Sequence, residues 1–401
     1  MHNFCDYRPM VRGSKDGQRI LLTDMQDRSS LAATRCLHAA GYEIDGTAIL
    51  RVAPGLCSRW CASRKVLTDP HQSLERYVSE LEQLVRQNRS AVLLPGTDET
   101  LYAVSSRRQR LTPHVEIGLP EPDAVERALD KSCLATEAAR AGIPTPEGHV
   151  CVDFGEAVDA AREFGFPLLV KATRTVVEAD GRLVRYPTVL VHDEAELRNA
   201  QQHIGRCIVQ RRCPGVMMSV AGVATDRGLL GSAVARYRRT WPVAAGQASF
   251  SETITPPGNL IERVSAMVEA IGWRGVFQLQ LIEDSKGAPR AIDFNPRLFG
   301  SMGLASAAGV PLAALWCGWL LGEDRDPVSA RAGVAYRCED SDVRHIAWRV
   351  RNGDFRAVGA LRPRRDTTHA WFDAQDPLPF VALWVALGHS RITRARRLRD
   401  K

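Results

Sequence analysis

The segment Asp293-Phe-Asn-Pro-Arg297 combines three polar residues that together could hold a metal ion and a phosphate. It follows an apolar run typical of a strand, and alternate strand residues share a face, so Asp293, Asn295 and Arg297 are expected to point the same way. Carboxylate and amide oxygens suit Mg²⁺, and arginine suits a phosphate. Hairpin pairing with the preceding strand would add Gln280. Polar residues on the exposed face of an antiparallel pair would give the same pattern.

Two lysines are the next candidates, because lysine is rare here: six of the 53 basic residues are lysine. Lys131 opens a predicted helix, and Lys171 ends an apolar strand, Leu168-Leu-Val-Lys171. An isolated charge at the end of a buried strand is costly unless it meets a partner, and a nucleotide phosphate is one. A side chain that reaches solvent is the alternative interpretation.

The elements that would position these residues begin with an N-terminal alternation of strands and helices. Strands are expected at 19–24, 42–50 and 91–95, with helices at 31–40, capped by Ser29 or Ser30, and at 71–88. This alternation predicts a doubly wound α/β domain with a parallel sheet. The first loop has no glycine, which excludes a GxGxxG dinucleotide site.

From about residue 125 the pattern changes to α+β. Helices are predicted at 130–141, 194–202 and 259–271, and single strands at 168–171 and 207–210. Two hairpins are predicted, one around Asp226-Arg-Gly228 and one joining 277–282 to 290–294. Residues 330–401 are predicted to form a C-terminal tail that contains strands and a final helix.

Bulk composition indicates a globular protein of two or three units. The chain has 401 residues, 45% apolar and 25% charged, and no apolar run approaches the ~18 residues needed to cross a bilayer. The polar N-terminus and ten scattered cysteines favour the cytoplasm and reduced thiols. The net charge of +7 is spread along the chain, so we predict no nucleic-acid partner and no stable membrane insertion.

Taken in order, these motifs resemble those of the ATP-grasp superfamily over roughly residues 90–325. The matching features are Lys131, Lys171, Gln210 within Val-Gln-Arg-Arg-Cys-Pro-Gly, and the Asn-Pro-Arg segment. Further similarity lies in Pro95-Gly-Thr-Asp-Glu99, in 238–242 and in 245–249. The resemblance is strongest to short carboxylate–amine ligases that look like half of a carbamoyl-phosphate synthase large chain.

The resemblance implies a three-part organisation. Residues 1–124 would form a Rossmann-like pre-ATP-grasp domain, and 125–328 an ATP-grasp domain with α+β subdomains at about 125–205 and 206–328. Residues 329–401 would be a C-terminal extension. A homodimer is also implied.

The resemblance also implies roles for single residues. Lys131 and Lys171 would contact the phosphates and the adenine side of ATP, and Gln210 would lie on the strand beside adenine. Gln280, Asp293 and Asn295 would hold one or two Mg²⁺ ions (or Mn²⁺), and Arg297 would stabilise the γ-phosphoryl group during transfer. The reaction would convert a small-molecule carboxylate to an acyl phosphate, which an amine, or a thiol, then opens.

The chain departs from the family pattern in three places. Gln280 stands where a glutamate is usual. The loop 172–181 after Lys171 has one glycine instead of several, so Arg174, Thr173 or Thr175 would substitute. No carboxylate lies at 217–219, where an acid usually holds the ribose.

The remaining predictions concern an arginine-rich segment, the C-terminal segment and the alternative functions. Arg236, Arg238 or Arg239 would bind a substrate carboxylate, unless they form a solvated edge strand. The apolar segment 377–387 followed by five arginines predicts a helix docked on the body, with a membrane-surface helix as the alternative. The alternative functions are a nucleotide-binding regulatory protein without turnover and a carboxylase that activates bicarbonate.

Overall fold

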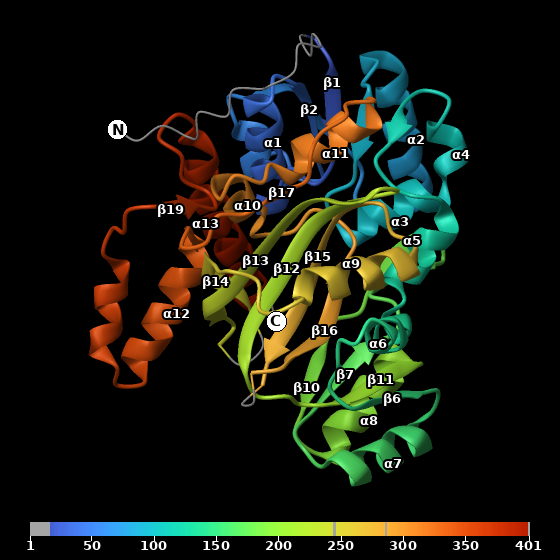
Figure 1. Ribbon diagram of the computed structural model, residues 1–401, viewed down its shortest axis with the longest axis vertical. Coiled ribbons are helices and arrows are strands. Elements are labelled where there is room, and N and C mark those ends of the chain that lie inside the picture. The colour runs from blue at the N-terminus through green and yellow to red at the C-terminus, as the bar shows by residue number, and fades with distance from the viewer. Residues whose placement is uncertain (1–16, 244–245, 285–286, 400–401) are drawn as a thin grey trace.

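The computed structural model describes residues 17–243, 246–284 and 287–399, with the side chains of the last helix described up to Gly388. The N-terminal domain lies at the top of the view in Figure 1 and the subdomain that follows it in the chain, called here the first subdomain, at the bottom, with a large sheet between them. Within the described residues no helix is long and apolar enough to cross a membrane.

The N-terminal domain is a five-stranded parallel sheet in the order β3-β2-β1-β4-β5, as expected for a doubly wound fold. Its strands are β1 (Arg19–Leu22), β2 (Glu43–Ala48), β3 (Cys61–Val66), β4 (Val92–Leu94) and β5 (Glu116–Ile117). Its main helices are α1 (Arg28–Ala39), α2 (Leu74–Asn88), α3 (Asp98–Ser106) and the short α4 (Arg108–Leu111). The sequence analysis missed β3, whose side chains are largely exposed, and β5, which has two residues.

The predicted cap of α1 was wrong. The helix begins at Arg28 with Asp27 at the N-cap, and Ser29 and Ser30 are buried inside its first turn. Ser30 Oγ donates to the carbonyl of Thr23 at 2.8 Å, so the serine connects the helix to the β1 loop instead of capping it.

The first subdomain has its own sheet and its own core. Helices α5 (Pro122–Leu129) and α6 (Lys131–Arg140) lead into it, and Asp130 caps α6 as expected. Its strand order is β10-β7-β11-β6, covered by α7 (Phe154–Phe164) and α8 (Glu194–Ile204). These strands are β6 (Gly148–Cys151), β7 (Leu168–Ala172), β10 (Val189–Val191) and β11 (Cys207–Arg211).

The segment after Lys171 forms a β-hairpin, which the sequence analysis did not predict. Strands β8 (Val176–Ala179) and β9 (Arg182–Arg185) pair around a turn in which Asp180 and Gly181 both have positive φ. Arg107 from the N-terminal domain donates to Glu178 at 3.0 Å, and Arg185 to Glu99 at 2.8 Å. The segment that the family resemblance made a phosphate-covering loop is therefore docked on the N-terminal domain.

The large sheet has eight strands, of which seven run β16-β15-β12-β13-β14-β18-β19 while β17 pairs with β13. Its strands are β12 (Val216–Thr225), β13 (Gly228–Trp241), β14 (Gln247–Thr253), β15 (Gly275–Glu283), β16 (Pro289–Asn295), β17 (Val328–Ser329), β18 (Ala335–Arg337) and β19 (Thr367–His369). Helices α9 (Leu260–Ile271), α10 (Met302–Ala307) and α11 (Leu312–Leu320) pack around it. Two hydrophobic core clusters each join this sheet to the N-terminal domain, so those two parts form a continuous body.

The C-terminal extension completes the large sheet, because β18 pairs antiparallel with β14 and β19 parallel with β18. Two helices follow in this region, α12 (Glu339–Arg351) and α13 (Leu378–Arg399). Leu383 of α13 is buried in the core cluster of Tyr336 and Trp371, so the docked interpretation holds for the described part of the helix. The proposed boundaries at 124/125 and 328/329 fall inside α5 and β17.

A buried carboxylate holds the extension against the large sheet. Asp342 of α12 is fully buried and accepts two hydrogen bonds from Arg239 of β13, at 2.6 and 2.9 Å. A nitrogen of Arg337 lies 3.2 Å from the same carboxylate. A buried charge that keeps both partners is compensated, whereas removing one partner leaves a charge without compensation.

We therefore expect Asp342→Ala to lower the free energy of unfolding by about 3–5 kcal/mol. Urea denaturation of purified protein measures this. Asp324→Ala is the matched control, because Asp324 is 79% exposed beside Arg227, and exposed pairs contribute roughly 0–1 kcal/mol. Equal stability of the two variants would contradict the assigned role of Asp342.

Candidate active site

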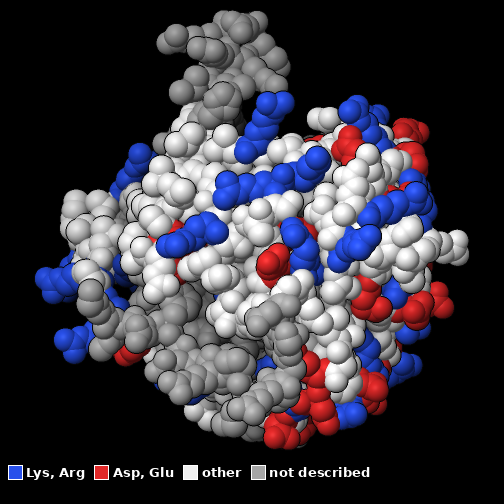
Figure 2. Space-filling view, turned by 90° about the horizontal axis from the view of Figure 1, so that it is seen from above, with Lys and Arg blue, Asp and Glu red and all other residues white. Residues whose placement is uncertain are grey.

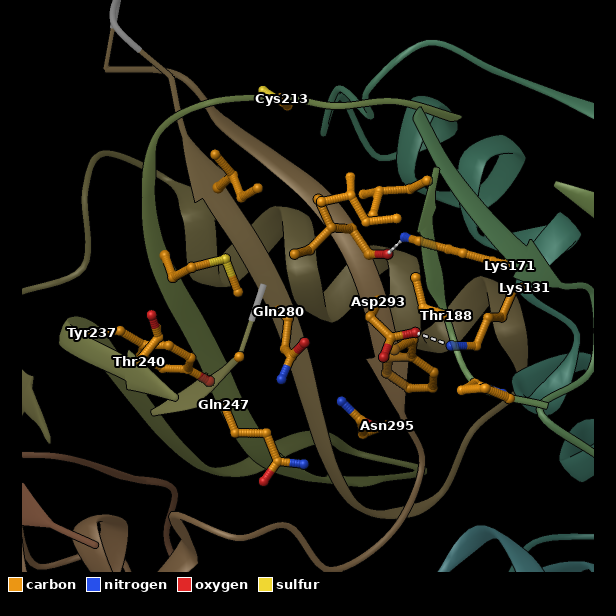
Figure 3. A pocket seen from close by; sticks show the side chains of 18 of the residues that line it. Lys131, Lys171, Thr188, Cys213, Tyr237, Thr240, Gln247, Gln280, Asp293 and Asn295 are labelled. Atoms are coloured by element: carbon orange, nitrogen blue, oxygen red, sulfur yellow. Dashed lines mark hydrogen bonds and ion pairs between the residues drawn. The ribbon is translucent and has the colours of Figure 1, made fainter. Parts of the chain in front are cut away.

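A cavity of about 650 Å³ lies where the first subdomain faces the large sheet and the N-terminal domain. Figure 3 shows Lys131 and Lys171 entering it from one side and Gln280, Asp293 and Asn295 from the hairpin opposite. Tyr237, Thr240 and Gln247 form another part of its wall. The cavity thus combines side chains from segments far apart in the sequence.

The β15–β16 hairpin sets the acidic and amide side chains. Gln280 is the register partner of Asp293, which confirms the predicted hairpin pairing, and Gln278 is the partner of Asn295. Phe294 lies between the two polar residues and is buried in the core, so Asp293 and Asn295 face the cavity together.

Lys131 and Lys171 approach this hairpin by different contacts. Lys131 Nζ forms an ion pair with Asp293 Oδ1 at 2.8 Å. Lys171 is 8% exposed, and its Nζ donates to the carbonyl of Ile292 at 2.9 Å. Burial lowers the pKa of Lys171 to about 8; attraction by Asp293 opposes this shift, and repulsion by Lys131 adds to it. The lysine is therefore poised to gain from a bound anion.

This pKa predicts that nucleotide affinity falls at alkaline pH. Below pH 8 Lys171 is already protonated, whereas above pH 8 a bound triphosphate must draw a proton onto it. We expect the Kd for MgATP to rise by up to about tenfold per pH unit above 8, because a tenfold population change costs 1.36 kcal/mol.

Isothermal titration calorimetry between pH 7 and 9.5 measures this dependence. Lys171→Met should bind MgATP more weakly at pH 7 and lose the alkaline rise. Lys65→Met, which removes an exposed lysine of β3, should keep the wild-type profile. An identical pH profile in Lys171→Met and wild type would contradict the assignment.

Arg297 connects the hairpin to the N-terminal domain. It donates to both carboxylate oxygens of Asp98, at 2.6 and 3.3 Å, and to Asn295 Oδ1 at 3.2 Å. Asp98 is the first residue of α3 and is 7% exposed. Burial alone would raise the pKa of Asp98, but the Arg297 guanidinium outweighs it and the pKa is lowered. The same ion pair keeps the pKa of Arg297 above its ordinary value despite burial.

The sequence analysis missed two residues of this arrangement. Asp98 lies in the quoted Pro95–Glu99 turn, yet its partner 199 residues away could not be inferred from the sequence. Tyr237 lines the cavity, and its hydroxyl lies within hydrogen-bonding reach of Ser219 and Gln280. Burial raises the pKa of Tyr237, so the phenol stays protonated and helps to orient the Gln280 amide.

Six predicted site residues line the cavity together: Lys131, Lys171, Gln280, Asp293, Asn295 and Arg297. Among the predicted substrate residues, Arg238 and Arg239 line it as well, although the buried contacts of Arg239 go to Asp342. Arg236 lies outside the lining and pairs with Glu283 at 2.5 Å. A β-bulge between Tyr237 and Arg239 interrupts the regular side-chain alternation of β13 between Arg236 and Arg239.

Gln210 and Arg174 also lie outside the cavity lining. Gln210 sits within β11, paired with Leu169 and Gly148, and the residues that follow it, Arg212 to Met217, form the wall instead. Arg174 bonds to Glu126 at 3.4 Å, whereas Thr175 beside it lines the cavity. Leu169, Leu190, Ile282 and Ile292 make this end apolar, as a base would require.

The oxygen ligands that the protein supplies fit a magnesium ion only if a bound nucleotide adds phosphate ligands. Asp293 supplies a carboxylate, Gln280 and Asn295 supply neutral amide oxygens, and the other lining carboxylate, Asp98, is paired with Arg297. Among the described residues no group of three or more His, Cys, Asp or Glu side chains could hold a metal ion. Mg²⁺ commonly binds through one or two carboxylates plus substrate phosphates, which is the arrangement possible here.

Comparisons with known proteins agree with the fold and the motif order. A family model described as "ATP-grasp in the biosynthetic pathway with Ter operon" matches residues 204–341. The N5-carboxyaminoimidazole synthetase structure from Staphylococcus aureus superposes with a TM-score of 0.61 and 12% identity, covering 80% of this chain and 81% of that one. The chain therefore has the ATP-grasp fold, and residues 204–341 match an ATP-grasp family model.

Other ATP-grasp structures superpose equally well. Biotin carboxylase from Campylobacter jejuni gives a TM-score of 0.61 at 16% identity, covering 80% of this chain and 75% of that one. The L-amino acid ligase from Bacillus licheniformis gives 0.60 at 13% identity, covering 80% and 79%. At these identities the structures show the shared fold.

Two curated sequences of the superfamily are more similar in sequence. The carbamoyl phosphate synthase large chain, C-terminal section, from Methanopyrus kandleri is 25% identical over 232 residues, covering 53% of this chain and 41% of the relative. The large chain from Thermus thermophilus is 26% identical over 211 residues, covering 48% and 19%. The chain thus spans less than half the length of these relatives. The resemblance predicted from the sequence motifs is confirmed at superfamily level.

Proposed function

We propose that this ATP-grasp protein is an ATP-dependent ligase that activates a carboxylate as an acyl phosphate and passes the acyl group to an amine. One observation carries the proposal: Lys131, Lys171 and Arg297 converge on the hairpin face that bears Asp293 and Asn295. Phosphoryl transfer depends mainly on positioning and charge neutralisation, and this cavity supplies both.

Each basic residue of the cavity is assigned a different phosphate contact. Lys171 donates to a phosphate from a buried site where its charge is weakly compensated. Lys131 leaves Asp293 to contact a second phosphate, which frees the carboxylate for the metal. Arg297, oriented by Asp98, contacts the γ-phosphoryl group as charge develops on it. Asp293, Gln280 and Asn295 would hold a Mg²⁺ ion, which would supply positive charge against the charge that develops on the phosphates.

The proposed reaction has two steps. An oxygen of the substrate carboxylate attacks the γ-phosphorus, a new P–O bond forms, and ADP leaves with the electrons of the broken bond. The amine nitrogen then attacks the acyl carbon, and inorganic phosphate leaves. Asp293, Asn295, Gln280 and Arg297 serve the first step, and the wall lined by Arg238, Thr240 and Gln247 faces the second substrate.

Two of the solved relatives support a second candidate. The Staphylococcus aureus structure is named as an N5-carboxyaminoimidazole synthetase and the Campylobacter jejuni structure as a biotin carboxylase, so activation of bicarbonate is the competing enzymatic function. Bicarbonate dependence of ADP release separates it from the ligase. A regulatory protein without turnover is the remaining alternative, and Gln280 is the feature that favours it.

The test is release of ADP from ATP in the presence of Mg²⁺ and pooled carboxylates and amines, with thiols in a parallel pool. The proposal requires ADP only when a pool is present, and dividing the pool then identifies the substrates. ADP release that needs bicarbonate alone would favour the carboxylase. ATP binding without ADP from any pool would favour the regulatory protein.

We propose no nucleic-acid partner, because the basic residues are spread along the chain. In Figure 2, which views the molecule from above, lysine and arginine side chains form several separate groups on this face. Acidic side chains gather mainly toward the right and lower parts of the view. We propose small-molecule substrates as partners, a homodimer as the assembly and the cytoplasm as the location.

A further inference from the structure

The cavity wall contains a histidine from the C-terminal extension that the proposed chemistry does not use. His345 lies on α12, is 7% exposed and lines the cavity beside Thr240. Its Nδ1 lies 2.8 Å from the carbonyl oxygen of Thr240. A carbonyl oxygen can only accept a hydrogen bond, so Nδ1 carries the proton, and in the neutral ring Nε2 keeps its lone pair.

The other ring nitrogen is available to a ligand. Within the part of the chain that the structure describes, Nε2 of His345 has no hydrogen-bond partner, and it is not among the buried polar atoms that lack one. Because His345 is otherwise buried and is a lining residue of the cavity, the cavity is where a ligand could reach this nitrogen.

The helix that carries His345 is held in place. Asp342 lies three residues before His345 in α12. Its carboxylate accepts hydrogen bonds from Arg239 at 2.6 and 2.9 Å. The Thr240 carbonyl that fixes the ring belongs to the same strand, β13, as Arg239. The imidazole is thus anchored through two separate contacts with one strand, and its second nitrogen is presented at a defined position.

The same end of the cavity also offers hydrogen-bond donors. Gln247 lines it, and Figure 3 shows this side chain lying across the cavity from Asn295. Gln247 Oε1 accepts a hydrogen bond from Arg28 at 2.5 Å, which fixes the amide and leaves its NH₂ group to donate. Arg238 also lines the cavity, with a partly exposed guanidinium that lies 3.4 Å from Glu252. His345 is the acceptor that complements these donors.

We propose that His345 is a substrate-recognition residue, whose Nε2 accepts a hydrogen bond from an N–H or O–H group of the substrate that occupies the end of the cavity lined by Thr240 and Gln247. This inference rests on the proposed ligase function. It makes the C-terminal extension part of the active site and restricts the substrate to molecules with a polar donor beyond the reacting group. A substrate whose remote portion is purely apolar would leave Nε2 unpaired, which costs binding free energy.

The first test probes accessibility and needs no substrate. The intact protein is treated with diethyl pyrocarbonate near pH 7, and each histidine is read by peptide mass spectrometry. We expect carbethoxylation of His345, and slower modification when MgATP and the carboxylate and amine pools are present. His149, 52% exposed on the first subdomain, reports reagent activity. Unmodified His345 beside modified His149 would overturn the inference.

The second test separates recognition from structure. His345→Asn places an amide nitrogen where Nδ1 donates to Thr240 but has no group at the Nε2 position. We expect its KM for one substrate to rise about 5–30-fold, with kcat, MgATP affinity and melting temperature near wild type. His345→Gln, whose amide reaches the Nε2 position, should recover part of the affinity, and His149→Asn should change nothing.

The outcomes distinguish this inference from the ligase proposal. If wild type releases ADP with a substrate pair and His345→Asn has an unchanged KM, His345 recognises nothing and the inference fails while the ligase stands. A lower melting temperature with equal loss of MgATP affinity would assign His345 a structural role and also overturn it. If wild type releases no ADP with any pool but His345 is modified and protected by one pool, recognition stands and the ligase proposal fails. Comparing substrate analogues that lack an amine, an amide or a hydroxyl identifies the donor group.

Discussion

Asp293→Ala is expected to lower Mg²⁺-dependent ADP release at least about 100-fold, because it removes the one carboxylate that faces the cavity from the β15–β16 hairpin. Electrostatic groups placed at a reacting centre typically contribute 10²–10³ in turnover. Gln280 and Asn295 remain as neutral oxygen ligands and cannot replace the charge. Steady-state assays with the substrate pool measure the loss.

The same substitution should have an opposite effect on metal-free nucleotide binding. Lys131 is held by Asp293 at 2.8 Å, and removing the carboxylate frees the lysine for a phosphate. We expect Asp293→Ala to bind ATP in the presence of EDTA at least as tightly as wild type does. Asp159→Ala, which removes an exposed carboxylate of α7, is the control and should change neither quantity. Undiminished turnover in Asp293→Ala would contradict the metal site.

Local patterns were enough to predict most elements around the site. The alternation at 277–282 and 290–294 predicted the hairpin, and the Gln280–Asp293 pairing followed from its register. Asp130 as the cap of α6 and Gly228 in the β12–β13 turn were likewise recognisable from residue type. These features depend on neighbours a few residues apart, which is the range that hydrophobic periodicity and turn chemistry describe.

Long-range contacts explain what could not be predicted. Nothing in the segment 172–181 indicates that its residues form a hairpin docked on the N-terminal domain, because the ion pairs of Glu178 and Arg185 reach residues 71 and 86 positions away. Asp98 and His345 enter the cavity through similarly distant packing. Arg236 was misassigned because a β-bulge changed the side-chain alternation after Tyr237.

The hydrophobic cores indicate which part of the molecule could move. The sheet of the first subdomain has its own core, whereas its β8–β9 hairpin contributes Val176 and Leu183 to a core that the N-terminal domain and the large sheet share. Lys171 and the β8–β9 hairpin belong to the first subdomain, yet the hairpin also contacts the N-terminal domain. A rigid-body movement of this subdomain would therefore carry Lys171 relative to Asp293 and strain the Arg107–Glu178 and Arg185–Glu99 pairs.

Arg297→Ala is expected to affect turnover and stability, and the two effects can be separated. An arginine that stabilises a transferring phosphoryl group contributes 10³–10⁵ in turnover, so we expect ADP release to fall at least about 10³-fold. The substitution also leaves Asp98 buried without its partner, which should cost about 3–5 kcal/mol of unfolding free energy at pH 7.

The stability cost should depend on pH with a definite sign. Arg297 lowers the pKa of Asp98 in the folded protein, so the carboxylate contributes stability above its unfolded pKa and loses that contribution as pH falls through the folded value. The difference between wild type and Arg297→Ala should therefore shrink in acid. Urea denaturation at pH 7 and at pH 4 measures it, and a difference that grows toward acid would contradict the assigned ion pair.

A double variant separates catalysis from stability. Arg297→Ala combined with Asp98→Ala removes both charges, so most of the lost unfolding free energy should return, because no unpaired carboxylate remains. Turnover should stay as low as in Arg297→Ala, since the missing guanidinium is what contacts the γ-phosphoryl group. If the double variant regained activity along with stability, Arg297 would act only by compensating Asp98. Arg297→Lys should retain part of the stability but little turnover, because an ammonium cannot hold Asp98 and Asn295 at once in the fork geometry seen here.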